Sequence, residues 1–262
     1  MTTSLPLAGK RILVTRPRAQ AKYLCDRLAA LGAVPIVFPT IEIAPLEDPT
    51  ALDRAVRDLA QYQWIIFTSV NGVKAFWERL EIAGSGLAPT QHIAAIGPAT
   101  ARALQAHGVT VTLIPDEYIA EAIVENIGAV QGQRILLPRA DIAREALAIE
   151  LQKRGAIVDE IAAYRTLPAA PDPIGLVELQ RGVDVITFTS SSTVRNFVAL
   201  VGRGSIPAST CVACIGPITA NTARELGLRV DILASEYTMA GLVSALTEYF
   251  ATKPLESARR PA

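Results

Sequence analysis

The chain has 262 residues, more than the ~100–150 residues of one typical domain, so two domains are expected. Hydrophobic residues make up 50% of it and charged residues 19%, which excludes a disordered chain and predicts a soluble globular protein. Its 25 basic and 25 acidic residues cancel, so no overall field exists to attract nucleic acid or an anionic membrane. Local groups must therefore hold any anionic ligand.

No stretch is apolar enough to span a bilayer, and the N-terminal residues MTTSLPLAGKR lack the pattern of a signal peptide, so we expect a cytoplasmic protein. The three cysteines, an odd number, argue against a disulfide framework. Cys211 and Cys214 have C-x-x-C spacing, but a strand at TCVACIG would turn them to opposite faces. Core packing is favoured for them, with redox or metal chemistry as the alternative. For His92 and His107, surface or capping roles are favoured over metal ligation.

Short apolar runs alternate with segments of helical period. In chain order the pattern predicts a strand at 11–16 (RILVTR), a helix near 19–31, a strand at 64–69 (WIIFTS), a helix near 70–81, a strand at 92–97 (HIAAIG), a helix near 98–107 and a strand at 111–115 (VTLIP). This alternation predicts an α/β fold with parallel sheets flanked by helices. Ligands of such sheets bind at the carboxyl ends of the strands.

The chain also contains two copies of one unit, because four motifs recur at offsets of 119 to 123 residues. The pairs are FTS at 67–69 and 188–190, GPxTA at 97–101 and 216–220, HGVTVTLIPDEY at 107–118 with LGLRVDILASEY at 226–237, and GKRILV at 9–14 with GQRILL at 132–137.

Proline-rich segments at 35–49 and 164–173 do not separate these copies. The piece before the first segment, about 30 residues, is too short to bury a core alone and must join the piece after the second. We therefore predict two parallel-sheet domains of flavodoxin-like or Rossmann-like fold, related by internal duplication and joined by two extended linkers. Domain 1 would comprise 1–38 and 168–262, with a polar tail from about 251; domain 2 would comprise 42–165; the linkers would be about 39–41 and 164–168.

The two GPxTA motifs are candidate anion sites. Gly97 and Gly216 end predicted strands, proline suits the first helical position, and Thr100 and Thr219 fall in the first turn. A helix N-terminus with an adjacent hydroxyl can bind a carboxylate or phosphate. A helix start without a ligand is the alternative, and the duplication weighs against it.

The FTS motifs place hydroxyl groups between a strand and a helix. Ser69 and Ser190 are candidate N-caps, while Thr68 and Ser191 are further candidates for ligand contact. Capping alone does not explain the run of hydroxyls from Thr189 to Thr193.

Arg16 and Arg139 occupy equivalent strand ends in the two copies. Guanidinium groups there would suit carboxylates, and a solvated surface arginine is the alternative. Tyr164 lies in the second linker, where its phenol could act as a weak acid or hydrogen-bond donor, or could simply pack.

No phosphate-binding loop, dinucleotide fingerprint, nucleophile elbow or HExxH motif occurs in the sequence. The residues by themselves therefore predict a two-domain α/β protein that holds a polyanionic small molecule in its cleft.

The chain combines TRP near the start, FTSxNGV, two copies of AxIGPxTA, a tyrosine-containing linker and the trailing EYTMAGLVSAL. In this combination it resembles the uroporphyrinogen-III synthase family over about residues 9–250. The resemblance implies a lyase of tetrapyrrole biosynthesis that cyclises the linear polycarboxylate hydroxymethylbilane, with loss of water and inversion of ring D, to uroporphyrinogen III. It implies no cofactor and no metal. A non-enzymatic two-lobed binding protein for a polycarboxylate is the alternative.

The resemblance also assigns residues. Tyr164 matches a tyrosine implicated in the family's function and would assist departure of the substrate hydroxyl. Thr100 and Thr219 match the hydroxyls of the family's two Gly-Pro turns, although Ile218 stands where some members carry another threonine. The candidate substrate-binding residues are Arg16, Thr68, Ser69, Gly97, Thr100, Arg139, Ser190, Ser191, Gly216 and Thr219. We expect a monomer without nucleic-acid or membrane partners, and a transient contact with the preceding pathway enzyme stays open.

Overall fold

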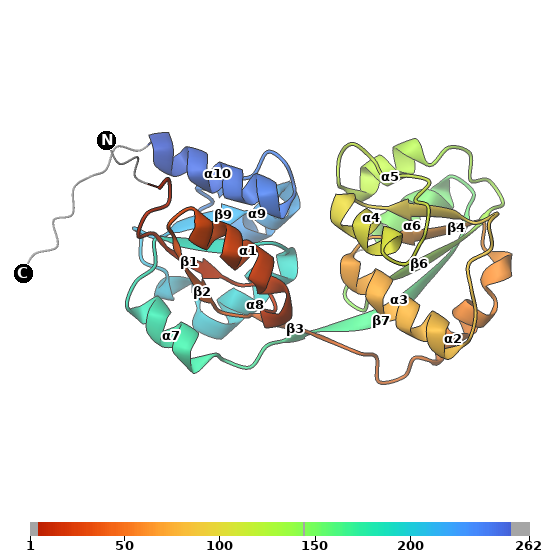
Figure 1. Cartoon of the computed structure of the whole chain (residues 1–262), viewed down its shortest axis with the longest axis horizontal. Coiled ribbons are helices and arrows are strands. Elements are labelled where there is room, and N and C mark those ends of the chain that lie inside the picture. Colours follow the sequence, from red (N-terminus) through yellow and green to blue (C-terminus); the bar gives the residue numbers. More distant parts are fainter. Residues whose placement is uncertain (1–4, 144, 253–262) are drawn as a thin grey trace, which may run out of the picture. The chain divides into compact units, whose positions relative to one another are not determined.

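A computed structural model describes residues 5–143 and 145–252 of the chain. The chain divides into two compact units, residues 1–42 with 167–262 (unit 1) and residues 43–166 (unit 2). It passes between them within two extended strands, β3 (Ile41–Ala44) and β7 (Ile157–Pro168), which Figure 1 labels. The polar tail expected from about 251 lies, beyond Thr252, outside the described residues.

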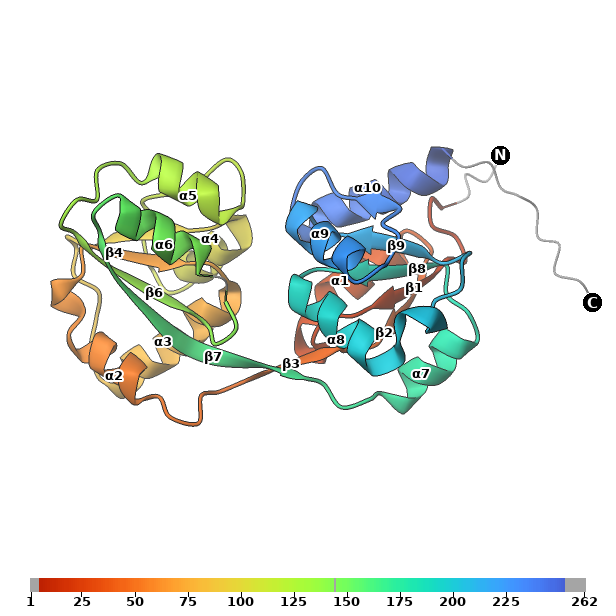
Figure 2. The same cartoon turned by 180° about the vertical axis from the view of Figure 1, so that it is seen from behind.

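Unit 1 is built on a parallel sheet with the strand order β10-β9-β8-β1-β2. Helices α1 and α10 pack on one face of this sheet (Figure 1), and α7, α8 and α9 pack on the other (Figure 2). The elements are β1 (Arg11–Val14), α1 (Arg18–Ala30), β2 (Val34–Val37), α7 (Pro173–Gln180), β8 (Val185–Phe188), α8 (Ser191–Val201), the 3₁₀ turn η2 (Arg203–Ser205), β9 (Cys211–Cys214), α9 (Pro217–Glu225), β10 (Ile232–Leu233) and α10 (Met239–Thr252).

Unit 2 has a sheet of order β3-β7-β6-β4-β5, in which β7, β6, β4 and β5 run parallel. Helices α2, α3 and α4 cover one face and α5 and α6 the other (Figures 1 and 2). Besides β3 and β7, the elements are α2 (Thr50–Arg57), the 3₁₀ turn η1 (Leu59–Gln61), β4 (Trp64–Phe67), α3 (Val70–Ile82), β5 (His92–Ala95), α4 (Pro98–Gln105), α5 (Ala120–Asn126), β6 (Arg134–Ala140) and α6 (Ala146–Lys153).

The two sheets have the same order, which reflects the internal duplication. Strands β2-β1-β8-β9-β10 of unit 1 correspond to β7-β6-β4-β5 and a bridge at Leu113 in unit 2. This is the flavodoxin-like order, so the prediction of two duplicated parallel-sheet α/β units is confirmed. Each unit combines strands from both sequence copies, because β1, which pairs with β2, also pairs with β8 rather than with β4.

The strand expected at VTLIP (111–115) does not form, since only Leu113 bridges to Ala94. The Thr112 side chain accepts the Ile93 N–H at 3.1 Å, which takes the place of a ladder bond. Pro115 follows and has no N–H to donate. The equivalent strand of unit 1, β10, has two residues.

Cys211 and Cys214 pack in the core of unit 1, whereas both histidines lie at the surface. Cys211 belongs to the apolar cluster beneath α1 and α10, whereas Cys214 belongs to the cluster beneath α8 and α9, so their predicted placement on opposite faces of the strand is confirmed. His107 stacks on Trp77 with ring centroids 4.6 Å apart, and His92 lies 4.8 Å from Trp64. Both histidines are exposed, so the expected surface role is confirmed, and each also contacts a tryptophan ring.

Helix α7 of unit 1 provides a test of local stability. Asp172 caps this helix and accepts the N–H groups of Ile174 and Gly175, both at 3.0 Å, while the exposed Arg18 pairs with the same carboxylate. We predict that Asp172→Ala lowers the free energy of unfolding by about 1 kcal/mol, whereas Asp172→Asn, which keeps the cap and loses only the surface ion pair, changes it by less than half as much. Urea unfolding followed by circular dichroism measures both; equal losses for the two variants would mean that the ion pair, not the cap, stabilises α7.

Candidate functional site

The predicted site residues lie at the carboxyl edge of each sheet, in two sets. In unit 1 they are Arg16 after β1, Ser190 and Ser191 after β8, and Gly216 and Thr219 after β9. In unit 2 they are Arg139 near the end of β6, Thr68 and Ser69 after β4, and Gly97 and Thr100 after β5. The strands β1 and β8 are neighbours whose following helices cover opposite faces, and so are β6 and β4. Such a switch point is where doubly wound sheets bind ligands.

The GPxTA motifs form the N-termini of α4 and α9. Gly97 and Gly216 are the N-cap residues, with extended backbone, and a proline follows each. The first N–H groups of a helix have no intrahelical acceptor, so they remain available to an anion. Thr100 and Thr219 are each 4% exposed, and no hydroxyl hydrogen bond is seen for either among the described residues. Each helix start therefore offers backbone donors and the hydroxyl of a largely buried threonine.

The two FTS turns cap the helices that follow them, as expected. Ser69 accepts the Gly72 N–H at 3.0 Å at the start of α3, and Ser190 forms a capping box with Thr193 at the start of α8. In unit 1 the Ser192 hydroxyl lies 2.9 Å from that of Ser190, and Ser191 lies 2.7 Å from the Thr222 hydroxyl of α9. Thr68 makes no side-chain hydrogen bond within the described chain. The hydroxyl run in unit 1 is thus largely engaged in its own network.

Arg16 and Arg139 are both withdrawn from solvent, so neither is a solvated surface arginine. Arg16 donates to the Thr189 hydroxyl at 3.1 Å and to the Gln20 side chain at 3.0 Å. Arg139 is 7% exposed and lies 3.4 Å from Glu160. Its Nε and Nη1 atoms make no hydrogen bond to any described group. Burial lowers the pKa of both arginines, and a guanidinium remains charged at neutral pH nevertheless.

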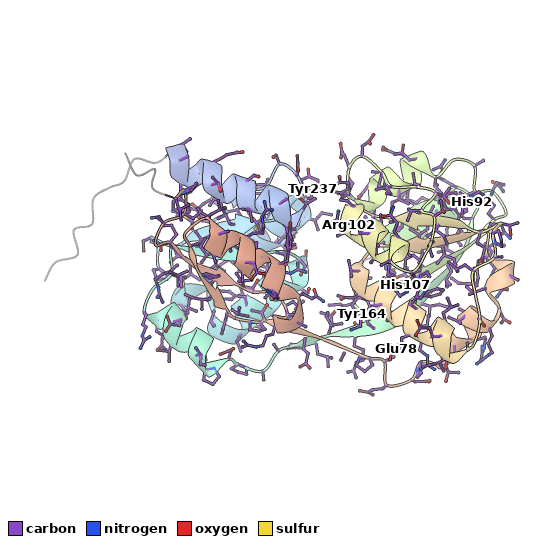
Figure 3. All side chains as sticks on the ribbon, in the orientation of Figure 1. Glu78, His92, Arg102, His107, Tyr164 and Tyr237 are labelled. Atoms are coloured by element: carbon purple, nitrogen blue, oxygen red, sulfur yellow. The ribbon has the colours of Figure 1, made fainter. Side chains whose placement is uncertain are left out.

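Tyr164 is aimed at α3 by a β-bulge. Arg139 pairs with Ala162 and the next residue of β6, Ala140, pairs with Tyr164, so Ala163 is an extra residue in β7. Ala163 and Tyr164 consequently both join the core cluster beneath α3, where strict alternation would have sent them to opposite faces. Figure 3 shows Tyr164 on this side of unit 2.

The phenol of Tyr164 is held at the start of α3. Tyr164 is 8% exposed, and its oxygen lies 3.0 Å from the Ser69 hydroxyl. Burial raises the pKa of Tyr164, an effect opposed by its hydrogen bonds to Ser69 and Asn71 and by the charge of Arg139. The phenol is therefore a packed group and also a protonated hydrogen-bonding group at neutral pH. Asn71 stands in the same polar turn as Thr68 and Ser69, but its hydrogen bond to Tyr164 was not predicted, since nothing in the sequence places it opposite that residue.

One pocket of about 380 Å³ lies in unit 2 beside α6 and is lined by Arg139, Asp141, Glu145, Gln152 and Glu160, with small apolar groups. Three carboxylates face one guanidinium there, which makes the pocket unsuitable for a polycarboxylate.

In the described part of the chain, no group of three or more His, Cys, Asp or Glu side chains is arranged to hold a metal ion. The described helices also include none that is both long and apolar enough to cross a bilayer.

Comparison with known proteins decides between an enzyme and a binding protein. The family model for uroporphyrinogen-III synthase HemD matches residues 23–244. The uroporphyrinogen-III synthase of Synechococcus elongatus is 38% identical over 93% of this chain and 97% of its own length. That of Chlorobaculum parvum is 30% identical over 91% and 98%.

The chain belongs to the uroporphyrinogen-III synthase family. It is accordingly a cyclising lyase of porphyrin biosynthesis, and the alternative of a non-enzymatic binding protein has no support. Solved uroporphyrinogen III synthase structures share the fold: one from Thermus thermophilus has a TM-score of 0.66 at 21% identity, covering 94% of this chain and 100% of that chain. One from Helicobacter pylori has a TM-score of 0.59 at 18% identity, covering 92% and 99%.

The raised pKa of Tyr164 predicts how this family member responds to alkali. Because the folded state holds the phenolic proton more tightly, Tyr164 stabilises the fold below its unfolded pKa of about 10, and that contribution is lost as the pH rises through the folded pKa. The difference in tyrosinate absorbance between the wild type and Tyr164→Phe should therefore titrate above pH ~10. A midpoint at or below the ordinary tyrosine value would contradict this assignment.

Proposed function

We propose that the two edge sets bind the carboxylates of hydroxymethylbilane and that Tyr164 assists departure of its hydroxyl. The observation that carries this proposal is the repetition of one anion-binding arrangement in both units, at the N-termini of α4 and α9. A substrate with carboxylates on every ring needs several such sites. With 25 basic and 25 acidic residues the chain offers no general positive field, so local donors must supply the attraction.

Backbone donors are the main carboxylate ligands in this proposal. The helix starts at Gly97 and Gly216 supply N–H groups whose direction is set by the helix itself, and Thr100 and Thr219 add one hydroxyl each. Arg139 adds positive charge near the unit 2 set, whereas Arg16 is already bonded to Thr189 and Gln20 and chiefly orders its loop. Thr68, Ser69, Ser190 and Ser191 complete the two edges, with the N-cap serines acting mostly through the helices that they begin.

Tyr164 is the proposed proton or hydrogen-bond donor. Its raised pKa keeps the phenol protonated at neutral pH, as a donor requires. The Ser69 hydroxyl, 3.0 Å away, can donate its own proton to the phenolic oxygen while accepting the Gly72 N–H. In that arrangement the Tyr164 proton is left free to point at the departing hydroxyl of the substrate.

In the remaining steps the protein mainly positions the substrate's rings and supplies no reacting group of its own. After loss of the hydroxyl as water, the electrophilic carbon and the attacking ring D both belong to the substrate. Ring D attacks through its substituted carbon to give a spiro intermediate, which fragments and closes with ring D inverted. Binding carboxylates at fixed helix starts would favour this route by restricting the substrate's conformations.

We also propose that the enzyme acts as a monomer in the cytoplasm. Every residue assigned above belongs to one chain, and Cys25, Cys211 and Cys214 are free thiols, which is usual in a reducing compartment. A transient contact with the preceding enzyme of the pathway remains a prediction, to be tested by co-sedimentation.

Separating the roles of Tyr164 and the edge hydroxyls tests this proposal. We predict that Tyr164→Phe lowers kcat by as much as 10²–10⁴-fold, the scale of general-acid assistance, with little change in KM. Single hydroxyl deletions, Thr100→Val, Thr219→Val, Ser69→Ala and Ser190→Ala, should mainly raise KM, because the backbone N–H donors survive each change. Initial rates with hydroxymethylbilane, followed by separation of isomers I and III, measure both effects.

Isomer I arises from spontaneous closure, so only isomer III reports the enzyme. A Tyr164→Phe enzyme with normal kcat would refute the assigned role of the phenol. Complete loss of isomer III from one hydroxyl deletion in a folded protein would refute the distribution of binding over many donors. Circular dichroism of each variant provides the folding control.

A further inference from the structure

Two tyrosines occupy equivalent places beside the Gly-Pro helix starts. Tyr118 ends the run HGVTVTLIPDEY and Tyr237 ends its duplicate LGLRVDILASEY, 119 residues later. A Cβ placed on Gly97 would lie 3.1 Å from Cγ of Tyr118, and one on Gly216 would lie 3.2 Å from Cγ of Tyr237. Each ring thus packs directly on the glycine that begins α4 or α9. Figure 3 labels Tyr237 in the loop before α10.

The contact explains why glycine stands at both helix starts. The backbone there is extended, with φ near 180° at both glycines, so no conformational demand selects glycine. A side chain would instead press on the ring, because 3.1–3.2 Å is closer than carbon atoms ordinarily approach. The same ring–glycine contact in both units is a shared structural device.

The hydroxyl groups of these tyrosines are not used by the fold. Both residues are half-buried, and within the described residues neither phenol has a hydrogen-bond partner. Packing against glycine requires only the ring, which phenylalanine would supply equally. In contrast, the phenol of Tyr62 bonds to Asp159 at 2.7 Å and that of Tyr164 to Ser69, so tyrosines with a structural hydroxyl have visible partners.

A second set of unpartnered groups lies on the same helix starts. Thr100 and Thr219 are 96% withdrawn from solvent, each 4% exposed, and their hydroxyls too lack a partner among the described side chains and backbone groups. Side chains of a helix lean toward its N-terminus, so a threonine in the first turn directs its hydroxyl there. Each unit therefore brings a threonine hydroxyl, free N–H groups and the ring of a tyrosine whose phenol is unpaired within the described residues to one helix start, and these donors suit a carboxylate.

We infer that Tyr118 and Tyr237 are equivalent substrate-binding residues, each of which donates its phenolic O–H to a substrate carboxylate held at the N-terminus of α4 or α9. The inference rests on the proposed function of these helix starts and adds the residues that select a carboxylate there. Glycine then serves to let Cγ and Cδ1 of the ring approach the helix start closely.

Removing only the hydroxyls tests the inference. We predict that Tyr118→Phe and Tyr237→Phe each raise KM about tenfold or more while kcat stays within about twofold, because a hydrogen bond to a charged group is lost in the ground and transition states alike. The double variant should multiply the two effects, since the sites lie in separate units. Tyr23→Phe, at an exposed position of α1 that is 55% accessible, is the matched control and should leave KM unchanged.

The dissociation constant of uroporphyrinogen III, measured anaerobically by calorimetry, is a second readout that does not depend on turnover. It should rise in parallel with KM. Wild-type KM and dissociation constant in both variants would overturn the inference, and an effect in only one would overturn the equivalence of the two tyrosines. An equal loss of kcat and thermal stability would show a structural role instead. A wild-type protein that binds the product but forms no isomer III would refute the proposed function, while the calorimetric comparison would still decide the inference.

Discussion

In a parallel sheet every strand ends at the same edge, and the helix that follows each strand begins there. This constraint decides where the chemistry of the protein can lie. The order β10-β9-β8-β1-β2 and its counterpart in unit 2 bring an arginine, a serine cap and a Gly-Pro helix start to one edge of each sheet, although they are as much as 200 residues apart in the chain. In the proposed function, free N–H groups with a fixed direction replace the cationic side chains that a polycarboxylate would otherwise require.

Tyr164 depends on a second, local constraint. Its neighbour Ala163 is the extra residue of a bulge between β6 and β7, which turns the phenol toward Ser69 rather than toward α6. The same serine caps α3, so one hydroxyl links the helix start to the phenol. Gly72 lets the start of α3 approach β6 closely, because a Cβ on this residue would lie 2.9 Å from the Pro138 carbonyl oxygen. The position of the Tyr164 phenol is therefore set by the backbone of three neighbouring elements.

The fold class was predictable because its signals are periodic and repeated. Buried strands such as WIIF and CVAC read as apolar runs, and the duplicated GPxTA motif marks strand end and helix start together. The site was only partly predictable. The unequal engagement of Arg16 and Arg139 depends on side chains from β7 and α1 that no motif brings together, and the bulge at Ala163 leaves no pattern in the sequence. The sequence shows that Tyr118 and Tyr237 occupy equivalent places in the repeat, but only the structure shows that each ring contacts a glycine at a helix start.

The proposed function assigns substrate binding to many hydrogen-bond donors and assistance of hydroxyl departure to the Tyr164 phenol. In that proposal, carboxylates are held by many weak, directional groups, so that no single side chain is indispensable, while Tyr164 would act at the one bond that must break. Titration of the ¹⁵N-labelled protein with uroporphyrinogen III, followed by backbone amide NMR signals, tests this most directly. The free amides of the α4 start, residues 99 and 100, and of the α9 start, residues 218 and 219, should shift together and saturate at the same ligand concentration. Binding that leaves either set of amides unshifted would contradict the claim that both helix starts hold the substrate's carboxylates.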